Sequence, residues 1–473
     1  MIPETGGGRF FFRSRHEGRR SSCVMHKNLQ DAVVKANKEC PKLMKLTVPI
    51  LIETVLSIAL GFVDVFMLSR YDDLAASGAG AANQVLTVMS MVFLVFSSSG
   101  GILIAQYLGA DQKENSSRAA ALSLVLHLLS GILVSLVIFI FGGQFLKFIG
   151  AADMVFTYAS KYLKIVGSFL FLQAVSAALG VIIRCHGKAK EPMIVAMGVN
   201  VLNIVLDFLL VPTMGVEGVA MATVIGRAVG VVALAVILFV KVEKPSIFRL
   251  LLPWPGRELK QVFKLGVPSA AETFLYHLSQ LIITSLVMWN LTEAELVAKT
   301  YMSNIAALFL LFSVSVGQAA QIVVGHKVGS GDFDGAKKEG FRAFRLALII
   351  SASTVVVGIL LRHPIISCFT GNPEVIHHAE VIFLVEFFLE CGRAGNLTFI
   401  PCLRGAGDVK FPTLWAIFSN MIIGLGGAQL LAINFGLGIH GLWVAMALDE
   451  LFRAVVMFFR WRSSKWKNKQ VTK

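Results

Sequence analysis

The stretch Pro49-Ile-Leu-Ile-Glu-Thr54 returns 219 residues later as Pro268-Ser-Ala-Ala-Glu-Thr273. Other residues recur with almost the same offset, and these pairs are Arg184 with Arg404, Gly187 with Gly407, Pro192 with Pro412, Asn200 with Asn420, and Gly109 with Gly329. Offsets that agree to within one residue in three separate places indicate an internal repeat. The chain is therefore predicted to consist of two homologous halves.

The composition is that of a membrane protein. Of the 473 residues 56% are hydrophobic and 15% are charged, and the mean hydropathy is +0.73. A helix needs about 20 apolar residues to cross the hydrocarbon core of a bilayer. Long runs without Asp, Glu, Lys or Arg meet this requirement, and they cover residues 74–110, 119–142, 273–292, 300–326 and 411–448. The alternating ten-residue strands of a membrane barrel do not occur.

Apolar windows and their Gly, Pro and charged boundaries predict twelve transmembrane helices, six in each half. Their predicted ranges are 46–68, 80–107, 119–142, 165–183, 192–212, 218–240, 265–290, 300–326, 346–361, 381–403, 412–434 and 438–459. The last two divide the run 411–448, with a break near Asn434 to Gly438. Because six is an even number, both halves have the same orientation in the membrane. The expected fold is an all-α integral membrane protein with two parallel six-helix lobes, an arrangement typical of transporters.

The distribution of Lys and Arg predicts the orientation. Loops after even-numbered helices and the C-terminal tail hold 24 of these residues, against 6 in the other loops. By the positive-inside rule both termini are cytoplasmic, and we expect a multi-pass protein of the cell membrane. The predicted segments are a cytoplasmic arm (1–45), an N-terminal lobe (46–240), a cytoplasmic linker (241–264), a C-terminal lobe (265–459) and a basic tail (460–473).

Several other classes of protein are not indicated. The net charge of +14 arises from short loops rather than from one basic face, so nucleic acid is not an expected partner. The six cysteines form no C-x-x-C pair, which argues against a disulfide framework or a zinc site. The sequence contains no phosphate-binding Gly-x-x-x-x-Gly-Lys-Ser/Thr loop and no catalytic set. We therefore expect neither an enzyme nor an organic cofactor.

Ionisable residues inside the predicted helices are the candidate functional residues, because each is costly in a bilayer. Glu53 and Asp64 are eleven residues apart, about three helical turns, and so share one face of the first helix. Asn203 and Asp207 form a polar stripe on the fifth helix together with Asn200. If the two stripes face each other, their oxygens can bind a proton or a small hard cation such as sodium. Alternatively, Asp64 snorkels or pairs with Arg227 of the sixth helix.

The second half lacks this arrangement. The repeat offset places Ile283 or Thr284 opposite Asp64 and Gly427 opposite Asp207. Its charged residues lie instead on the seventh, tenth and twelfth helices, and they are Glu272, Glu386, Glu390, Arg393, Asp449, Glu450 and Arg453. Many of them are spaced three or four residues apart, which favours internal ion pairs. Glu272 is the exception, because it is the only charged residue within the seventh helix.

Six motifs, in their order and spacing, resemble those of the multidrug and toxic compound extrusion (MATE) family over residues 40–460. They are Val48-Pro49 with Gly61-Phe-Val-Asp64, Asn200-x-x-Asn203-x-x-x-Asp207, Gly215-Val-Glu-Gly218-x-Ala220-x-Ala222-Thr223, Gly317-Gln318 with Gly329-Ser-Gly-Asp332, Cys402-Leu-Arg404-Gly-Ala-Gly-Asp408-x-x-x-Pro412, and Trp443-x-Ala445-x-x-x-Asp449-x-x-x-Arg453. The rival major facilitator fold usually shows a Gly-x-x-x-Asp-Arg/Lys-x-Gly-Arg signature after its second helix. Here that loop begins Gly109-Ala-Asp111-Gln-Lys, which does not match.

The MATE resemblance implies a coupling site and a set of substrate-binding residues. It places the first and fifth helices in contact and implies cation coupling at Asp64, Asn203 and Asp207, with Thr223 as a further candidate. These three would also hold the metal ion if sodium is the coupling ion. Substrate binding is expected at a second set of residues, which are Glu53, Glu272, Tyr276 and Glu390. Other family members carry a carboxylate about one turn after Glu272, where this chain has Tyr276-His277, and this departure weakens the assignment of Glu272.

The expected function is secondary active export of amphipathic, mostly cationic organic compounds in exchange for protons or sodium ions, by a protein expected to be a monomer. The alternative is a lipid-linked oligosaccharide flippase or polysaccharide exporter of the same superfamily. A flippase would be expected to line its cleft with several Arg or Lys residues for phosphate, whereas carboxylates dominate the predicted helices. A membrane receptor or sensor is a third possibility, but it would be expected to carry a soluble effector domain.

Overall fold

The computed structural model describes residues 40–151 and 153–472, and within these ranges the regular structure is entirely helical. Of the predicted arm (1–45), residues 1–39 lie outside the described residues, and residues 43–45 already belong to the first helix. The first lobe contains α2 (Leu43–Tyr71), α3 (Asp73–Gly109), α4 (Lys113–Phe148), α5 (Asp153–Ser168), α6 (Leu170–Cys185), α7 (Lys190–Met214) and α8 (Val216–Lys241). The second contains α9 (Gly256–Asn290), α10 (Glu293–Gly329), α11 (Phe333–Leu360), α12 (Arg362–Ser367), α13 (Pro373–Gly405), α14 (Lys410–Ser419) and α15 (Gly438–Arg462). Short η1 (Pro245–Leu251) and η4 (Lys465–Lys469) lie in the linker and the tail.

The helices account for twelve crossings of a membrane. In the described ranges eight are long and apolar enough by themselves, with α14 counted together with its π-helical continuation to Asn434, and the bent pair α5 and α6 makes a ninth. The remaining three crossings are α9, α13 and α15, which have 35, 33 and 25 residues and carry most of the charged residues of the second lobe. The predicted fold class, twelve transmembrane helices in two parallel lobes, is confirmed.

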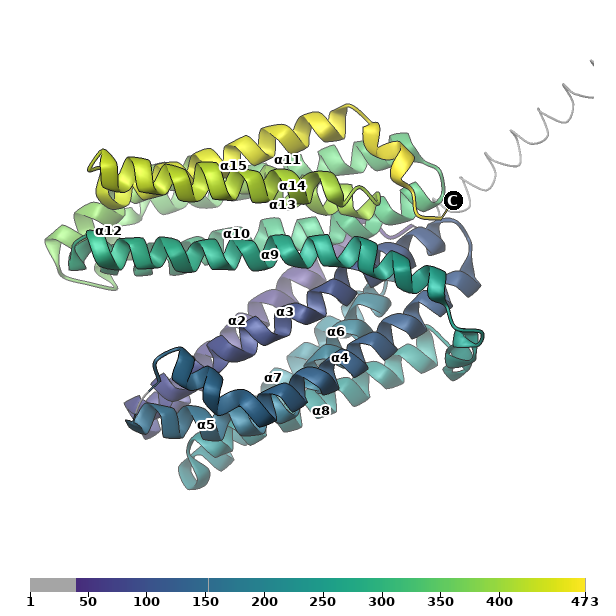
Figure 1. Ribbon diagram of the computed structural model, residues 1–473, viewed down its shortest axis with the longest axis horizontal. Coiled ribbons are helices and arrows are strands. Elements are labelled where there is room, and N and C mark those ends of the chain that lie inside the picture. The colour runs from purple at the N-terminus through teal and green to yellow at the C-terminus, as the bar shows by residue number, and fades with distance from the viewer. Residues whose placement is uncertain (1–39, 152, 473) are drawn as a thin grey trace, which may run out of the picture.

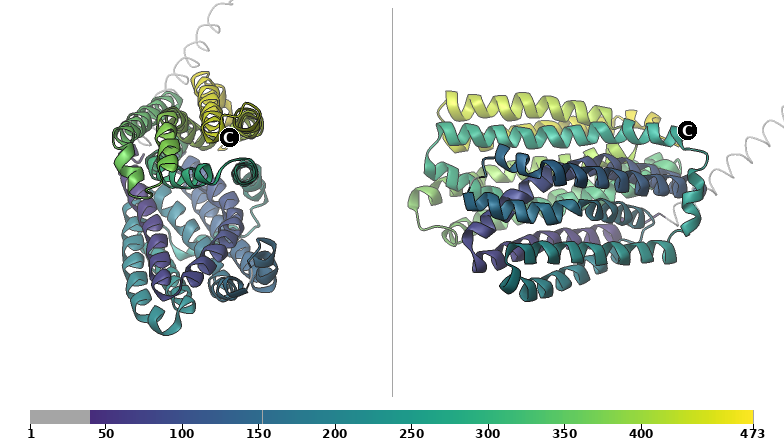
Figure 2. Two further views of the ribbon diagram at one scale, coloured as in Figure 1. Left: turned by 90° about the vertical axis from the view of Figure 1, so that its left-hand side faces the viewer. Right: turned by 60° about the horizontal axis from the view of Figure 1, so that its bottom comes forward.

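The two lobes pack against each other as related halves. Figure 1 shows α2 to α8 on one side of the molecule and α9 to α15 on the other, and Figure 2 shows the helices running along one common direction. Between the lobes α2 packs against α10 and α3 packs against α9, while α3 and α10 pack against each other. Because α2 corresponds to α9 and α3 to α10 in the repeat, exchanging the lobes reproduces the same set of contacts.

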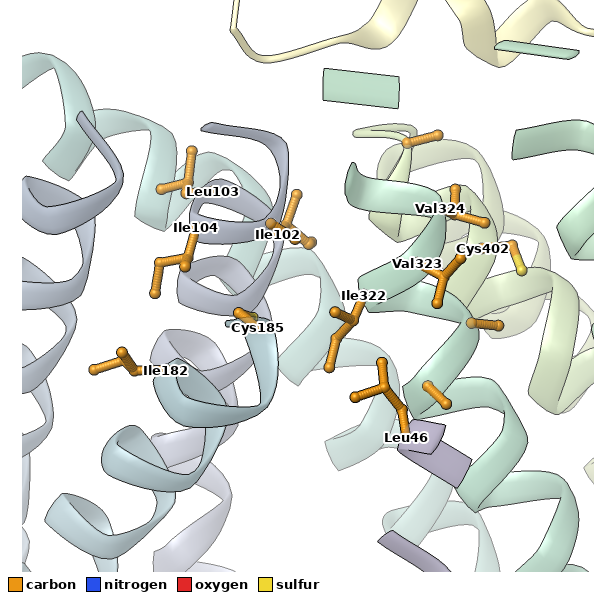
Figure 3. Packing of buried hydrophobic residues seen from close by; sticks show 14 of the residues in the cluster. Leu46, Ile102, Leu103, Ile104, Ile182, Cys185, Ile322, Val323, Val324 and Cys402 are labelled. Carbon is orange, nitrogen blue, oxygen red and sulfur yellow. The ribbon is translucent and has the colours of Figure 1, made fainter. Parts of the chain in front are cut away.

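The lobes share a hydrophobic core at one end only. We call the end that carries Gly109, Gly329 and Gly405 the closed end, and the opposite end, which carries Tyr71 and Ser367, the open end. One cluster of buried residues at the closed end combines both lobes, and Figure 3 shows its side chains from α3 and α6 facing those from α10. Two further clusters lie toward the open end, and each belongs to a single lobe. The ribbons of the lobes diverge in that direction (Figure 1).

Some helix boundaries differ from those predicted. The fourth crossing starts at Asp153 rather than at 165, and it bends by 47° between α5 and α6. At the bend the Phe171 N–H is bound by Ser135 Oγ of α4 at 3.1 Å, which satisfies a donor close to the helix break. In the linker, α9 begins at Gly256 rather than at 265. The break between the last two crossings, at residues 435–437, is where the sequence predicts it.

Candidate functional site

Polar faces of α2 and α7 meet inside the first lobe. The amide Nδ2 of Asn200 donates a hydrogen bond of 2.8 Å to the Leu56 carbonyl of α2. This contact sets the two helices in register, and the polar stripe of α7 thereby faces Asp64 of α2. The structure thus brings together the residues that were predicted to face each other.

Asp64, Asn203 and Asp207 form one cluster, which we call the carboxylate cluster. With its nitrogen facing the two carboxylates, the Asn203 amide donates to Asp64 Oδ1 at 3.1 Å and to Asp207 Oδ2 at 3.0 Å. The two aspartates also contact each other. Asn203 is 1% exposed and Asp207 is fully buried, and Asp207 Oδ1 has no hydrogen-bond partner in the described part of the chain. The cluster therefore has an unused oxygen.

Thr223 lies beside this cluster on α8 but uses its hydroxyl within its own helix. Its Oγ1 donates to the Val219 carbonyl at 3.0 Å, and its backbone nitrogen lies 3.2 Å from the Asn203 amide oxygen. Thr223 therefore helps to orient Asn203, because a donor on this side turns the amide nitrogen toward the carboxylates.

Two residues complete the surroundings of the cluster. Arg227 of α8 interacts electrostatically with Asp64 and with Tyr162 of α5, and Arg227 Nη1 has no hydrogen-bond partner among the described atoms. Tyr162 is buried and interacts with Thr223 and Asn83. From the sequence, Arg227 was considered only as an alternative ion-pair partner of Asp64. Tyr162 was missed because it precedes the predicted start of the fourth helix at 165.

The charges of the cluster define what it can bind. Two carboxylates face one guanidinium, so a single negative charge remains when all three groups are ionised. In a site of low dielectric this charge is costly unless a cation neutralises it. The carboxylate oxygens can bind either a proton or a small hard cation, whereas the Asn203 oxygen accepts from the Thr223 nitrogen and is turned away from them. In the described residues no group of three or more His, Cys, Asp or Glu side chains is arranged as a metal site, so a sodium ion here would need amide, carbonyl or water oxygens as well.

The second lobe contains a cavity of about 280 Å³, which is lined by residues of α9, α10, α13, α14 and α15. Its polar lining includes Glu272, Tyr276, Arg393, Arg404, Glu450 and Arg453. Glu272 Oε2 accepts hydrogen bonds from Arg404 Nη2 at 2.7 Å and from Thr413 at 3.2 Å. The predicted substrate residues Glu272 and Tyr276 thus lie at one cavity.

Glu390 is not among the residues that line this cavity. It is fully buried behind Arg393, whose Nη1 lies 2.7 Å from Glu390 Oε1 and 3.5 Å from Glu386 Oε1. Glu386 also accepts a hydrogen bond of 2.7 Å from Trp443 Nε1. The position of Glu390 therefore favours the ion-pair interpretation for this residue.

Glu53 forms an ion pair with an arginine in the first lobe, as Glu272 does in the second lobe. Arg184 Nη1 lies 2.9 Å from Glu53 Oε2, and Arg404 Nη2 lies 2.7 Å from Glu272 Oε2. The glutamates are 219 residues apart and the arginines 220, so the two ion pairs are equivalent in the repeat. Each fastens the first helix of its lobe to the fourth. Glu53 and the carboxylate cluster lie on the same helix, but Glu53 is not part of the cluster.

The second-lobe cavity is lined by three arginines and two carboxylates, Glu272 and Glu450, and further carboxylates lie behind them. Arg453 Nη2 binds Asp449 at 2.7 Å and Glu450 at 2.8 Å, and Asn396 donates to Glu450 Oε2 at 2.8 Å. Together with the pairs of Arg393 and Arg404, the network of described residues contains five carboxylates and three guanidinium groups. Buried carboxylate oxygens of Glu386 and Glu390 lack hydrogen-bond partners in it.

Two repeated six-helix lobes, closed at one end and carrying buried charged clusters at membrane depth, define the class of multi-pass membrane transporters. Comparisons with known proteins agree with this class. The MatE family model matches residues 49–209 and 268–428, so the matched segments are related by the same offset of 219 residues. The chain belongs to the MATE family.

Relatives and solved structures cover nearly the whole chain. It is 33% identical to the uncharacterized transporter YisQ of Bacillus subtilis, covering 90% of this chain and 94% of that protein. It is 27% identical to the probable multidrug resistance protein NorM of Thermotoga maritima, covering 91% and 94%. A solved outward-facing structure of a multidrug resistance MATE family transporter is similar in fold, with a TM-score of 0.82 at 19% identity, covering 89% of this chain and 96% of that chain.

Proposed function

We propose that this chain is a secondary active antiporter, which exports amphipathic and mostly cationic organic compounds in exchange for protons or sodium ions. The carboxylate cluster is the observation that carries the proposal. Asp64 and Asp207 share the Asn203 amide, Asp207 is fully buried while Asp64 is half-buried, and the Arg227 guanidinium interacts with Asp64. A buried site with one uncompensated negative charge favours binding of one monovalent cation. Relatives of this chain bear the names of multidrug resistance proteins, which agrees with export of organic compounds.

Cation binding is coupled to the arrangement of the lobes through α2. A proton or sodium ion on Asp64 or Asp207 removes the repulsion between them and changes the contact of α2 with α7. Near the closed end the same helix α2 packs against α10 of the other lobe. A change at the cluster therefore biases the contact between the lobes, and the difference in cation affinity between two access states sets the size of that bias.

The substrate class follows from the charge of the second-lobe network. The ion-pair network has five carboxylates against three arginines, of which Glu272, Glu450 and all three arginines line the cavity itself. The cavity also has apolar walls, including Leu275, Leu310 and Ile400. A cationic amphipathic compound offers both a positive charge and an apolar surface to such a cavity, so that the cost of removing its charge from water is reduced. Neutral amphipathic compounds would gain the apolar contacts only.

The orientation belongs to the same proposal. The closed end carries the basic loops and the C-terminal tail, so by the positive-inside rule it faces the cytoplasm, with both termini on that side. The protein would then lie in the cell membrane, and the described state would be open to the outside. Closing the open end would then carry a cation bound at the carboxylate cluster inward.

The experiment that tests the proposal is flux in proteoliposomes. Purified protein is reconstituted with a fluorescent cationic substrate such as ethidium, and a proton gradient or a sodium gradient is imposed separately. We expect uphill substrate movement with one of the two gradients and none without a gradient. Substrate movement that ignores both gradients would overturn the antiport proposal.

One observation bears on the alternative of a flippase for a lipid-linked sugar. Three arginines, Arg393, Arg404 and Arg453, line the second-lobe cavity, as a phosphate site would require. Each of them forms an ion pair with at least one carboxylate of the same lobe. A phosphate would have to displace these carboxylates, and we therefore favour the exporter.

A further inference from the structure

Two equivalent hydrogen bonds join the lobes at the closed end. Gln106 Nε2 of α3 donates to the Gly405 carbonyl of α13 at 2.8 Å. In the opposite direction, His326 Nε2 of α10 lies 2.8 Å from the Cys185 carbonyl of α6. Gln106 and His326 are 220 residues apart, and so are Cys185 and Gly405. The two bonds are therefore the same contact made once by each half of the repeat.

The backbones of α3 and α10 touch beside these bonds. A Cβ atom added at Gly109 would lie 1.9 Å from the His326 carbonyl oxygen, and one added at Gly329 would lie 2.0 Å from the Gln106 carbonyl oxygen. Only glycine permits so close an approach. At the closed end α3 and α10 are thus closely packed at their backbones. Small movements of one lobe against the other must break this packing.

The C-terminal segment, residues 465–472, adds to only one of these two bonds. The Val471 N–H donates to Gln106 Oε1 at 2.8 Å, and Gln470 Nε2 donates to the Gly329 carbonyl at 3.3 Å. Gln106 is fully buried, and its amide is thereby satisfied on both sides, by Gly405 as acceptor and by Val471 as donor. The segment follows the last helix of the second lobe, yet its Val471 is hydrogen-bonded to Gln106 of the first lobe.

Two tryptophans fasten this segment to the second lobe. Trp466 is fully buried and stacks on Trp461 of α15, with ring centroids 4.4 Å apart and planes inclined by 9°. Trp466 Nε1 also donates to the Trp461 carbonyl at 2.9 Å. Because the segment is anchored by burial at one end and hydrogen-bonded to Gln106 at the other, it spans the junction of the lobes.

We propose that Gln106 and the C-terminal segment act together as a clasp that holds the closed end shut and sets the balance between the two access states. Opening this end separates Gln106 from Gly405 or from Val471. The first of these bonds is buried and the second is partly buried, and the loss of either is unfavourable. Gln106 is a positioning residue, since neither it nor the segment lies at the carboxylate cluster or the second-lobe cavity. The inference rests on the proposed function in one respect only: the state in which the closed end has opened is taken to be the state that loads substrate.

Cys185 offers a direct measurement of opening. It is fully buried at the closed end, and its carbonyl is the acceptor for His326; Figure 3 shows it on the side of α6 that faces Ile322 of α10. In a variant that keeps Cys185 as the sole cysteine, the rate of alkylation by N-ethylmaleimide reports how often the closed end opens. The protein is purified and held in lipid nanodiscs, without substrate or gradient.

Two substitutions remove hydrogen bonds of the clasp in different ways, and a third substitution serves as the control. Gln106→Leu removes both bonds of the amide. Val471→Pro removes only the N–H that Gln106 accepts, and the preceding Gln470 has φ −51° and ψ 136°, which a following proline tolerates. Val471→Ala keeps the N–H and shortens the side chain. We expect alkylation of Cys185 to become about fivefold faster in Val471→Pro, since one net hydrogen bond shifts an equilibrium by roughly that factor. It should be faster still in Gln106→Leu, which loses both bonds, and should stay near the reference rate in Val471→Ala.

The outcomes separate the clasp from simple packing and from the antiport proposal. Unchanged alkylation in Val471→Pro, in protein that melts at the reference temperature, would overturn the clasp even if Gln106→Leu fails to fold. Equal acceleration in Val471→Ala would also overturn it, because the apolar contact and not the hydrogen bond would then hold the end shut. The labelling needs no gradient, so a failure of uphill flux would remove the antiport proposal and leave this result standing.

Discussion

Asp64 of α2 and Asp207 of α7 are joined through one amide, because Asn203 lies 3.1 Å from Asp64 Oδ1 and 3.0 Å from Asp207 Oδ2. Groups that share a partner in this way titrate and bind cations as a unit. Neither carboxylate can lose its charge without changing what the other contacts.

We therefore expect Asp64→Asn to fold and to bind substrate, but to lose gradient-driven export. Asp207→Asn should behave in the same way, and the double variant should be little worse than either single one, since their effects on a shared site are not additive. Uptake into proteoliposomes measures the effect, with Asp73→Asn, a change of an exposed aspartate at the start of α3, as the control. Normal uphill transport by Asp64→Asn would remove the cluster from the coupling mechanism.

Glu272→Gln is expected to weaken transport of cationic substrates more than that of neutral ones. The glutamate lines the second-lobe cavity, and loss of its charge should raise KM for a cation roughly tenfold, equivalent to about 1.4 kcal/mol. Glu53→Gln is the matched control, because it breaks the equivalent ion pair with Arg184 in the first lobe. Equal losses for cationic and neutral compounds in Glu272→Gln would show that the residue acts through its pairing with Arg404 alone.

Gly109→Ala and Gly329→Ala should each force the closed end apart. The added Cβ would meet a carbonyl oxygen of the other lobe at about 2 Å, a distance that cannot be relieved without separating α3 from α10. We expect faster alkylation of Cys185 and slower export in both variants. Gly80→Ala is the control, since a Cβ there meets nothing within 4 Å and alanine favours the helix by up to about 1 kcal/mol.

The proposed orientation is tested by a cysteine at position 252 in an otherwise cysteine-free chain. Leu252 is 81% exposed in the linker between the lobes, so Leu252→Cys should react readily in broken membranes. In intact cells we expect no reaction with a membrane-impermeant maleimide, because the linker would face the cytoplasm. Labelling from outside would show that the chain has the opposite orientation in the membrane.

Hydropathy and the internal repeat were enough to predict the helices and their division into two lobes, since both are properties of the chain itself. Helical periodicity also predicted a polar stripe on each of the helices that carry Asp64 and Asp207, while the MATE resemblance implied that the two residues share a site. The sequence did not predict Tyr162 at the cluster, as the fourth crossing begins at Asp153 rather than at 165 and bends on its way.

Pairings between residues that are distant in the chain could not be predicted from the sequence. Arg404 was recognised as the repeat partner of Arg184, but nothing local links it to Glu272, which precedes it by 132 residues. The tail was predicted only as a basic segment, because Trp466 and Val471 stand among lysines and polar residues. Their burial depends on the shape of the junction between the lobes, which is a tertiary property.

The stacked pair of Trp461 and Trp466 gives the protein an optical signal of its own. Two indoles that stack at 4.4 Å couple their electronic transitions, and such coupling produces a paired band in the far-ultraviolet circular dichroism spectrum, where the indole transition is strong. Release of the C-terminal segment would separate the rings and abolish that band, while the other tryptophans would contribute an unchanged background. Movements of the tail can thus be followed in unlabelled protein, at the same time as substrate or a cation gradient is applied.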